Sequence, residues 1–352
     1  MIEIKNLLLD FNGHFKLSID NLIIPKGEIF AVIGPNGAGK TTLLNTIALF
    51  EKPEKGIINV FGENILNLRD RISFRRKCSY VFPQPHLLNE TVYYNILLPL
   101  KFRGVRAKGN PERVLDFFRI KHLKYKNASM LSNGERHRVA LARAFVTDPE
   151  LILFDEPFSG LDSLCKESII NDIKKTVQLC KTTIIFVTQD YNEVLALADE
   201  VAIMMDGVIL QRGKPEEILT RPVSKKIADF VGIKTIVETE IVKKENNLCY
   251  VKTGGKTIEV VSDYNCGDRV YLCIRPEDVI ISRYEEKNSA RNHLQGKISY
   301  IERLVDRYQM SIDCGFELIA FITKNSFEEL NLKIGEDVFV SFKATAIHLI
   351  KK

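Results

Sequence analysis

A glycine-rich segment near the N-terminus has the residue types of a phosphate-binding loop. The sequence GPNGAGKTT follows the apolar run IFAVIG and opens the helical pattern KTTLLNTIALF, which is the strand–loop–helix context that the GxxxxGK[ST] pattern requires. Glycines let the backbone wrap closely enough for its N–H groups to face phosphate oxygens, and the following helix adds its dipole. We therefore predict nucleotide binding by Gly34, Pro35, Asn36, Gly37, Ala38, Gly39, Lys40, Thr41 and Thr42.

Two side chains of this loop and two carboxylates farther along the chain supply the predicted chemistry. Lys40 can reach the β- and γ-phosphates of ATP, and the Thr41 hydroxyl can bind Mg²⁺. The buried-strand pattern LILF ends in Asp155 and Glu156. The first acid can hold Mg²⁺ through water, and the second can take a proton from an attacking water. An acidic pair at a strand end more often caps the next helix, but after a phosphate loop it predicts hydrolysis of ATP.

A third segment, LSNGERHRVALARAF at 131–145, lies between these two motifs. It resembles the signature of ATP-binding cassette (ABC) ATPases, which is usually LSGGQ followed by a basic, alanine-rich helix. The other parts of that family occur in order, with Gln84 in YVFPQ, Asp162 in SGLD, and VT-x-D at 187–190. The resemblance runs through about residues 2–232.

The resemblance implies a head-to-tail homodimer in which each ATP lies between the phosphate loop of one subunit and the signature of the other. The start of the signature helix would present free N–H groups and a positive dipole end to an anion, although the same residues also fit a simple helix cap. Asn133 replaces a usual glycine, and asparagine tolerates positive φ better than other side chains. The residues expected to contact the second subunit's ATP are Ser132, Asn133, Gly134, Glu135 and Asp162.

Two further positions take roles from the resemblance. Phe11 lies where the family places an aromatic ring that stacks on adenine, although packing in a core or turn is an equal interpretation. Gln84 resembles the residue that contacts Mg²⁺ or the attacking water and senses a membrane partner. Residues 85–130 would then form a helical subdomain that docks onto a permease.

Gln189 departs from the family, which normally has histidine at this position. The family's imidazole contacts the γ-phosphate and helps to position the attacking water. A glutamine amide can donate a hydrogen bond, but it cannot carry a positive charge or shuttle a proton. The site is therefore either retired from hydrolysis or slower but working. The intact phosphate loop, Asp155 and Glu156 favour a working site in which Gln189 takes part in catalysis.

The elements that carry these residues alternate between strand and helix patterns up to about Gly232. Such alternation predicts an α/β domain with a largely parallel, helix-covered sheet. Beyond Gly232 the pattern changes to short strands separated by glycine-containing turns, which predicts a small all-β, OB-like barrel. We therefore expect an ATPase domain at 1–232 and a regulatory β-barrel domain at 233–352.

Segments 288–299, 318–332 and 342–349 resemble the molybdate/tungstate-binding (TOBE/Mop-like) barrel of importer ATPases. Importers of iron, sulfate, sugars and polyamines carry barrels of the same general class. A tetrahedral dianion needs N–H and O–H donors, although turns and strand edges also carry such groups. Ala344 replaces a serine that is common in these barrels. The candidate donors are Ser289, Arg291, Asn292, Thr323, Ser326, Lys343 and Thr345.

Composition fits a protein without membrane spans of its own. Apolar residues make up 45% of the chain, charged residues 27%, and the net charge is only +5. The seven scattered cysteines indicate reduced thiols rather than a disulfide framework. We expect a peripheral protein at the cytoplasmic face of the membrane that binds an integral permease, a second copy of itself and, indirectly, an external solute-binding protein. Nucleic acid is not an expected partner, although a non-transport ABC ATPase acting on nucleic acid or ribosomes is the alternative from another class.

Overall fold

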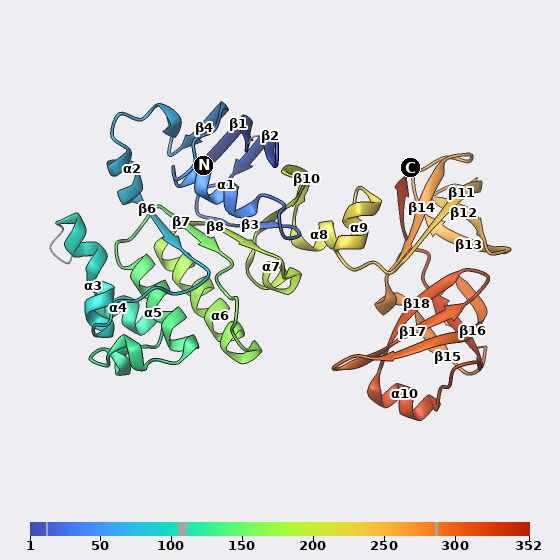
Figure 1. The fold of residues 1–352 in the computed structure, drawn as a ribbon. Coiled ribbons are helices and arrows are strands. Elements are labelled where there is room, and N and C mark those ends of the chain that lie inside the picture. The colour runs from blue at the N-terminus through green and yellow to red at the C-terminus, as the bar shows by residue number, and fades with distance from the viewer. Residues whose placement is uncertain (12, 105–110, 286–287) are drawn as a thin grey trace. The chain divides into compact units, whose positions relative to one another are not determined.

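In the computed structural model the chain forms two compact units, Met1–Ile218 and Leu219–Lys352 (Figure 1). The structure describes residues 1–11, 13–104, 111–285 and 288–352. The division differs from the predicted boundary after residue 232, because helix α9 (Lys225–Phe230) packs with the second unit. Ala228 on this helix shares an apolar cluster with Cys273 and Ile350. Among the described residues, no helix combines the length and apolar character needed to cross a bilayer.

A largely parallel sheet forms the centre of the first unit, with strand order β10-β9-β3-β8-β7-β6. Only the β9–β10 pair of these neighbours is antiparallel. Every residue of β3, β7 and β8 is buried, as expected for parallel strands that are covered on both faces. The strands are β3 (Ile29–Ile33), β6 (Cys78–Val81), β7 (Leu151–Asp155), β8 (Thr183–Thr188), β9 (Glu200–Met205) and β10 (Val208–Gly213).

Helices connect these parallel strands, which confirms the predicted α/β class. The carboxyl ends of parallel strands meet at one edge of a sheet, and β3, β6, β7 and β8 end just before the phosphate loop, Gln84, Glu156 and Gln189 respectively. The fold therefore brings four motifs, far apart in the sequence, to one edge. The connecting and following helices are α1 (Lys40–Ile47), α5 (Asn133–Phe145), α6 (Ser163–Cys180), α7 (Tyr191–Leu197) and α8 (Pro215–Thr220).

A second, antiparallel sheet packs beside α1 with strand order β2-β1-β4-β5. Its alternating buried residues, such as Ile4 and Leu17, join Leu44 and Ile47 of α1 in one apolar core. This packing fixes the helix that follows the phosphate loop. The elements are β1 (Ile2–Asp10), β2 (Lys16–Ile24), β4 (Lys55–Val60), β5 (Glu63–Asn64), the 3₁₀ turn η1 (Ile65–Asn67) and α2 (Arg71–Lys77).

The predicted helical subdomain at 85–130 contains α3 and α4, which pack against each other and against α5. Residues 105–110 of that range lie outside the described residues. Asn95 on α3 is buried and ties the preceding loop to the helix through hydrogen bonds with the backbone of Leu88. The elements are α3 (Val92–Arg103), α4 (Pro111–Phe117), η2 (Lys121–Leu123) and η3 (Ala128–Met130).

The second unit is built mainly from antiparallel strands, as predicted for a β-barrel. Two sheets, ordered β13-β12-β11-β14-β20 and β15-β19-β16-β17-β18, share a core that includes Val251, Leu272, Met310 and Val340. The elements are β11 (Thr235–Glu245), β12 (Leu248–Thr253), β13 (Lys256–Val261), β14 (Arg269–Ile274), η4 (Pro276–Asp278), β15 (Ile280–Ser282), β16 (Asn292–Arg303), β17 (Arg307–Asp313), β18 (Glu317–Thr323), α10 (Lys324–Leu330), β19 (Asp337–Phe342) and β20 (His348–Lys351).

Candidate nucleotide-binding and hydrolysis site

The phosphate loop joins β3 to α1 and has no room for side chains at two of its glycines. A Cβ on Gly34 would lie 1.9 Å from the Met204 carbonyl oxygen. Gly39 has φ +99°, and a Cβ there would lie 2.6 Å from the Phe15 ring. Because Gly39 is also the N-cap residue of α1 and has no side chain to cap it, the N–H groups of the first turn are left for an anion. This geometry fits the phosphate-binding role predicted from the motif.

Lys40 folds back over the loop that precedes it. Its Nζ donates hydrogen bonds to the carbonyl oxygens of Gly34 at 2.8 Å and Pro35 at 3.0 Å. Burial lowers the pKa of Lys40, and the negative charges of Glu156 and Asp155 partly oppose this effect. The ammonium group therefore lies within the loop, near both acids.

The two side chains predicted to hold Mg²⁺ lie together. The Thr41 hydroxyl donates a hydrogen bond to Asp155 Oδ1 at 2.9 Å, and the Tyr80 hydroxyl donates to Asp155 Oδ2 at 3.2 Å. Burial raises the pKa of Asp155, and these two hydrogen bonds oppose the rise. A hydroxyl and a carboxylate are hard oxygen ligands of the kind that Mg²⁺ selects. The residues present therefore fit the ion.

Gln189 is in direct contact with Glu156. Its Nε2 donates a hydrogen bond to Glu156 Oε1 at 2.8 Å, and adjacent strands bring the two residues together because Asp155 pairs with Val187. Glu156 has φ +45°, a left-handed conformation that costs a non-glycine residue on the order of 1 kcal/mol. Its backbone N–H is bound by the Val187 carbonyl at 3.0 Å. The amide of Gln189 thus holds the carboxylate that we predicted to be the base.

The signature segment begins α5 as a helix cap. The Ser132 hydroxyl accepts a hydrogen bond from the Glu135 N–H, and the Glu135 carboxylate accepts one from the Ser132 N–H, which together form a capping box. Asn133 is the first residue of the helix, so it does not need the positive φ that we had considered for it. Its side-chain amide instead donates to the Gly160 carbonyl at 2.9 Å. The next residue, Gly134, lies against the Cys165 sulfur.

The remaining predicted residues lie around these groups. Phe11 is 38% exposed, and its ring centroid lies 6.2 Å from that of Phe15, the ring that borders Gly39. Asp162 caps α6 by accepting a hydrogen bond from the Cys165 N–H at 2.9 Å. Gln84 is exposed just beyond β6.

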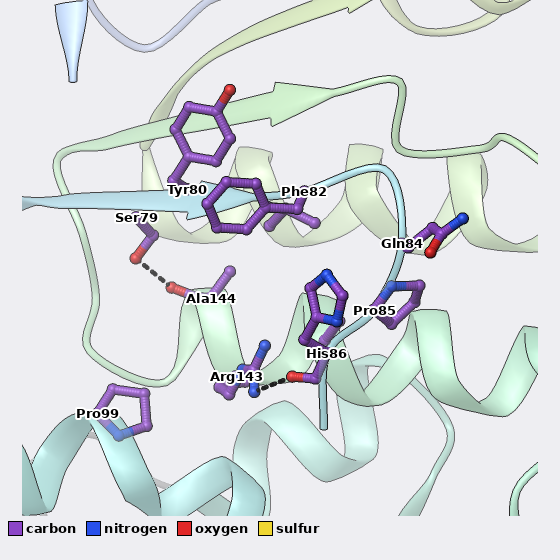
Figure 2. A pocket seen from close by; sticks show the side chains of 11 residues that line it. Ser79, Tyr80, Phe82, Gln84, Pro85, His86, Pro99, Arg143 and Ala144 are labelled. Atoms are coloured by element: carbon purple, nitrogen blue, oxygen red, sulfur yellow. Dashed lines mark hydrogen bonds between the residues drawn. The ribbon is translucent and has the colours of Figure 1, made fainter. Parts of the chain in front are cut away.

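Gln84 also lines a cavity of about 120 Å³ between β6 and the helical subdomain (Figure 2). In Figure 2 the rings of Tyr80 and Phe82 lie along the strand, while Arg143 of α5 donates to the His86 carbonyl at 2.8 Å. Tyr80 therefore links this cavity to the predicted Mg²⁺ ligands, because its hydroxyl contacts Asp155.

Sequence comparisons place this geometry in a known family. Residues 17–159 match the ABC transporter family model, and residues 288–349 match the TOBE domain model. The chain is 36% identical, over 99% of both chains, to the molybdate/tungstate import ATP-binding protein WtpC of Pyrococcus horikoshii. The chain belongs to the ABC transporter family of ATP-binding proteins. It is therefore an ATPase, as its phosphate loop and acidic pair predicted.

Other relatives carry different names. The spermidine/putrescine import ATP-binding protein PotA of Fusobacterium nucleatum is 33% identical over 95% of this chain and 88% of its own length. A solved structure of cbiO1 from Clostridium perfringens, part of an ABC transporter complex, has a TM-score of 0.57 at 27% identity, covering 66% of this chain and 94% of that one. A dimeric ATP-binding cassette bound to ADP and Pi has a TM-score of 0.54 at 30% identity, covering 61% and 99%.

The candidate oxyanion donors lie in the TOBE region of this ABC protein. Strand pairing places Asn292 opposite Phe342, so segments 288–292 and 342–345 meet at one end of a sheet. Asn292 is buried, and its amide is bound to the backbone of Glu259 by bonds of 2.8 and 2.9 Å. Arg291 pairs with the Glu259 carboxylate at 3.1 Å. Ser289, Lys343 and Thr345 are exposed.

The structure thus places an acidic residue, Glu259, beside Arg291. The segments that contain the candidate donors, 288–292 and 342–345, have no acidic residue of their own. The Asn292 amide is already hydrogen-bonded to the backbone of Glu259 on β13, so we interpret Asn292 as a structural group. The remaining candidate donors are Ser289, Arg291, Lys343 and Thr345. Thr323 and Ser326 have a local role, since the Thr323 side chain caps α10 by accepting from the Ser326 N–H.

Tyr80 is a site residue that sequence reasoning missed. Its hydroxyl lies 3.2 Å from Asp155 Oδ2 and 3.1 Å from Asn45 Oδ1, and burial and the nearby Asp155 carboxylate raise its pKa. Tyrosine is an ordinary strand residue, and Asn45 is an ordinary helix residue. The useful signal would have been the position of Tyr80 on β6, the strand that pairs with β7 beside Asp155.

Proposed function

We propose that this ABC ATPase powers import of an oxyanion, with molybdate or tungstate as the cargo. The observation that carries the proposal is similarity along 99% of the chain to the WtpC protein, which includes the TOBE region. Import of a polyamine is the second candidate, because the PotA protein of Fusobacterium nucleatum is similar over 95% of this chain. The geometry of the ATPase site suits both candidates equally.

Hydrolysis would use the groups at the edge of the parallel sheet. The loop N–H groups and Lys40 bind the phosphates, with the ammonium exchanging its bonds to loop carbonyls for bonds to phosphate oxygens. Thr41 and Asp155 would hold Mg²⁺, and Gln84 is the proposed third contact. The ion supplies positive charge against the phosphate oxygens when it is bound. Glu156 accepts the proton of the attacking water, while Gln189 orients its carboxylate.

A head-to-tail homodimer would complete each ATP site. Ser132 and Asn133 are exposed at the start of α5, where they are accessible to the nucleotide of a second subunit. Glu135 holds Ser132 through the capping box, and Gly160 holds Asn133. Asp162 lies in the same SGLD segment as Gly160, so we propose that the signature and this segment meet the second subunit together.

An integral membrane permease is the proposed partner at the helical subdomain. Phe82, Leu88 and Phe102 are exposed apolar side chains of this region, with exposures of 49%, 47% and 77%. Phe82 lines the cavity together with Gln84, and exposed apolar side chains that gather on one surface are typical of an interaction site. Gln84 lines that cavity, so docking there would connect the permease to the ATPase site. The chain would then lie peripherally at the cytoplasmic face of the membrane and meet an external solute-binding protein only indirectly.

Transport by the assembled complex tests the cargo. The full chain and its co-purified permease would be placed in proteoliposomes with the solute-binding protein, and ATP-dependent uptake of molybdate, tungstate and spermidine would be measured. Uptake of the oxyanions alone supports the proposal, whereas uptake of spermidine alone supports the second candidate. Failure to capture any integral membrane protein, together with RNA- or DNA-stimulated ATP hydrolysis, would instead support a non-transport ATPase.

A further inference from the structure

One cluster of ionic groups holds both chain neighbours of Gln189. The Thr188 hydroxyl donates a hydrogen bond to Glu193 Oε2, and the Asp190 N–H donates to the Thr188 hydroxyl at 3.0 Å. The ammonium of Lys166 donates to Glu193 Oε1 at 2.6 Å and to Asp190 Oδ2 at 3.0 Å. The Glu193 side chain is only 6% exposed and that of Lys166 is 25% exposed. Lys166 therefore holds the side chain of Asp190 directly and that of Thr188 through Glu193.

Lys166 belongs to a different element from the groups that it binds. It lies in the first turn of α6, and its backbone N–H donates to the Asp162 carbonyl at 2.9 Å. Asp162 itself caps this helix from the SGLD segment. Asp190 and Glu193 belong instead to the start of α7, where Asp190 is the N-cap residue. The lysine thus connects the segment proposed to meet the second subunit with the end of β8.

The ionised form of this cluster is the stable one. Burial would lower the pKa of Lys166, but its hydrogen bonds to Glu193 and Asp190 outweigh that effect and raise it. For Asp190, burial would raise the pKa, but the bonds from Lys166 and from the Asn192 N–H lower it. Removing the lysine would leave two carboxylates close together without their countercharge, and one of them, Glu193, is only 6% exposed, where an unpaired charge is costly.

We propose that Lys166 is a positioning residue for ATP hydrolysis, which fixes the Gln189 amide against the Glu156 carboxylate and ties this contact to the SGLD segment. The proposal rests on the role proposed above for Glu156 as the base. Gln189 is exposed, and its side chain reaches Glu156 at 2.8 Å. The residues on both sides of it belong to the cluster that Lys166 binds. Without Lys166, the residues beside Gln189 are no longer held in place. The Gln189 amide then no longer fixes the orientation of the Glu156 carboxylate.

Steady-state ATP hydrolysis by the full chain tests this role through Lys166→Met and Lys166→Arg. Lys166→Met should lower kcat by about tenfold with KM for ATP changed less than about twofold, because the loss concerns orientation in the transition state. Lys166→Arg, which keeps the charge and donors, should recover most of kcat. Lys124→Met is the matched control, since Lys124 is also largely buried, at 19% exposed, and pairs with Glu112. This control should retain the wild-type kcat.

A double-mutant cycle distinguishes positioning from general destabilisation. If Lys166 acts through Gln189, Lys166→Met should lower kcat much less in a Gln189→Ala background than in the wild type. An equal fold-loss in both backgrounds overturns the proposal, as does a wild-type kcat for folded Lys166→Met. Should Lys166→Met fail to fold, Asp190→Asn serves in the same cycle, because asparagine can still cap α7. Glu156→Gln is measured separately. A result showing that Glu156 is not the base can then be told apart from a result showing that Lys166 and Gln189 are not coupled.

Discussion

At the scale of single residues, the contact between Gln189 and Glu156 explains how a glutamine can stand where the family has histidine. A side-chain amide donates directed hydrogen bonds through its NH2 group and has a single charge state. The 2.8 Å bond to Glu156 Oε1 uses that property to orient a carboxylate. An imidazole could do the same and would also titrate near neutral pH. In the mechanism proposed above, the glutamine would therefore keep the orienting role without the ionisation.

The carboxylate of Glu156 should be indispensable for hydrolysis but not for ATP binding. Glu156→Gln retains the size of the side chain and one acceptor oxygen, yet an amide cannot accept the proton of the attacking water. We expect kcat to fall by roughly 10²–10⁴-fold, with nucleotide affinity within a few-fold of wild type. Single-turnover hydrolysis and binding of a fluorescent ATP analogue measure the two effects. A wild-type rate for this variant would show that Glu156 is not the base.

Substitutions of Gln189 should separate orientation from ionisation. Gln189→Ala removes a hydrogen bond to a carboxylate and should lower kcat by about tenfold or more, while Gln189→His should leave kcat similar or raise it. Because neither glutamine nor alanine ionises, the ratio of their rates should be flat over about pH 6–8. The histidine-to-wild-type ratio should instead change around pH ~6.5. A wild type that shows no turnover until histidine is restored would mean a retired site.

At the scale of elements, the phosphate loop depends on close backbone packing between the β3–α1 connection and β9. Gly34 lacks a positive φ, so its requirement for glycine is steric, set by the Met204 carbonyl 1.9 Å from an added Cβ. Gly34→Ala should therefore displace the loop, destabilise the fold by about 1–3 kcal/mol or more and abolish nucleotide binding. Gly213→Ala is the matched control, because its nearest neighbour is the flexible Glu217 carboxylate at 3.4 Å.

Thermal unfolding with and without ATP measures both effects. Gly34→Ala should lower Tm and remove the rise in Tm that ATP gives to the wild type. Gly213→Ala should keep that rise. Equal behaviour of the two alanine variants would contradict the steric role of Gly34.

The sequence predicted local elements better than the contacts between them. The phosphate loop, the strand end at Asp155 and the cap at Ser132 depend on residues that are neighbours in the chain, so their patterns are readable directly. The Tyr80–Asp155 contact and the Gln189–Glu156 contact depend on which strands are adjacent in the sheet. Asn292 shows the same limit, because its amide is bound by Glu259, a residue on β13. Pairing across long sequence separations leaves little trace in a single chain.

At the scale of the whole molecule, relatives that align with nearly all of this chain are named for different cargo. A molybdate/tungstate import protein and a spermidine/putrescine import protein each align with nearly all of this chain, at 36% and 33% identity. Proteins that align with nearly all of this chain are therefore named for cargo of opposite charge. In this chain, the exposed Arg291 that pairs with Glu259 in the TOBE region is a candidate for recognising an oxyanion.

The full chain should bind molybdate and tungstate at the end of the β-rich unit where segments 288–292 and 342–345 meet. Binding there would allow the imported ion to regulate the ATPase, since a ligand shifts an equilibrium by its differential affinity for two states. We expect dissociation constants on the order of micromolar for molybdate and tungstate by calorimetry. Arg291→Ala and Lys343→Ala should weaken binding of both anions, whereas Lys324→Ala, an exposed lysine of α10, should not.

Because Glu259 is negatively charged, replacing it should change ligand binding in a direction that depends on the sign of the ligand's charge. Its carboxylate pairs with Arg291 at 3.1 Å, so it competes with any oxyanion for that guanidinium. Glu259→Gln should therefore strengthen molybdate and tungstate binding, because the arginine is released and a repelling charge is removed. A polyamine would respond in the opposite direction, since it would lose an acidic partner. Calorimetric titration of wild type and Glu259→Gln with molybdate and with spermidine distinguishes an oxyanion site from a polyamine site. Tighter spermidine binding to wild type than to Glu259→Gln, with no heat from the oxyanions, would contradict an anion site and favour the polyamine candidate.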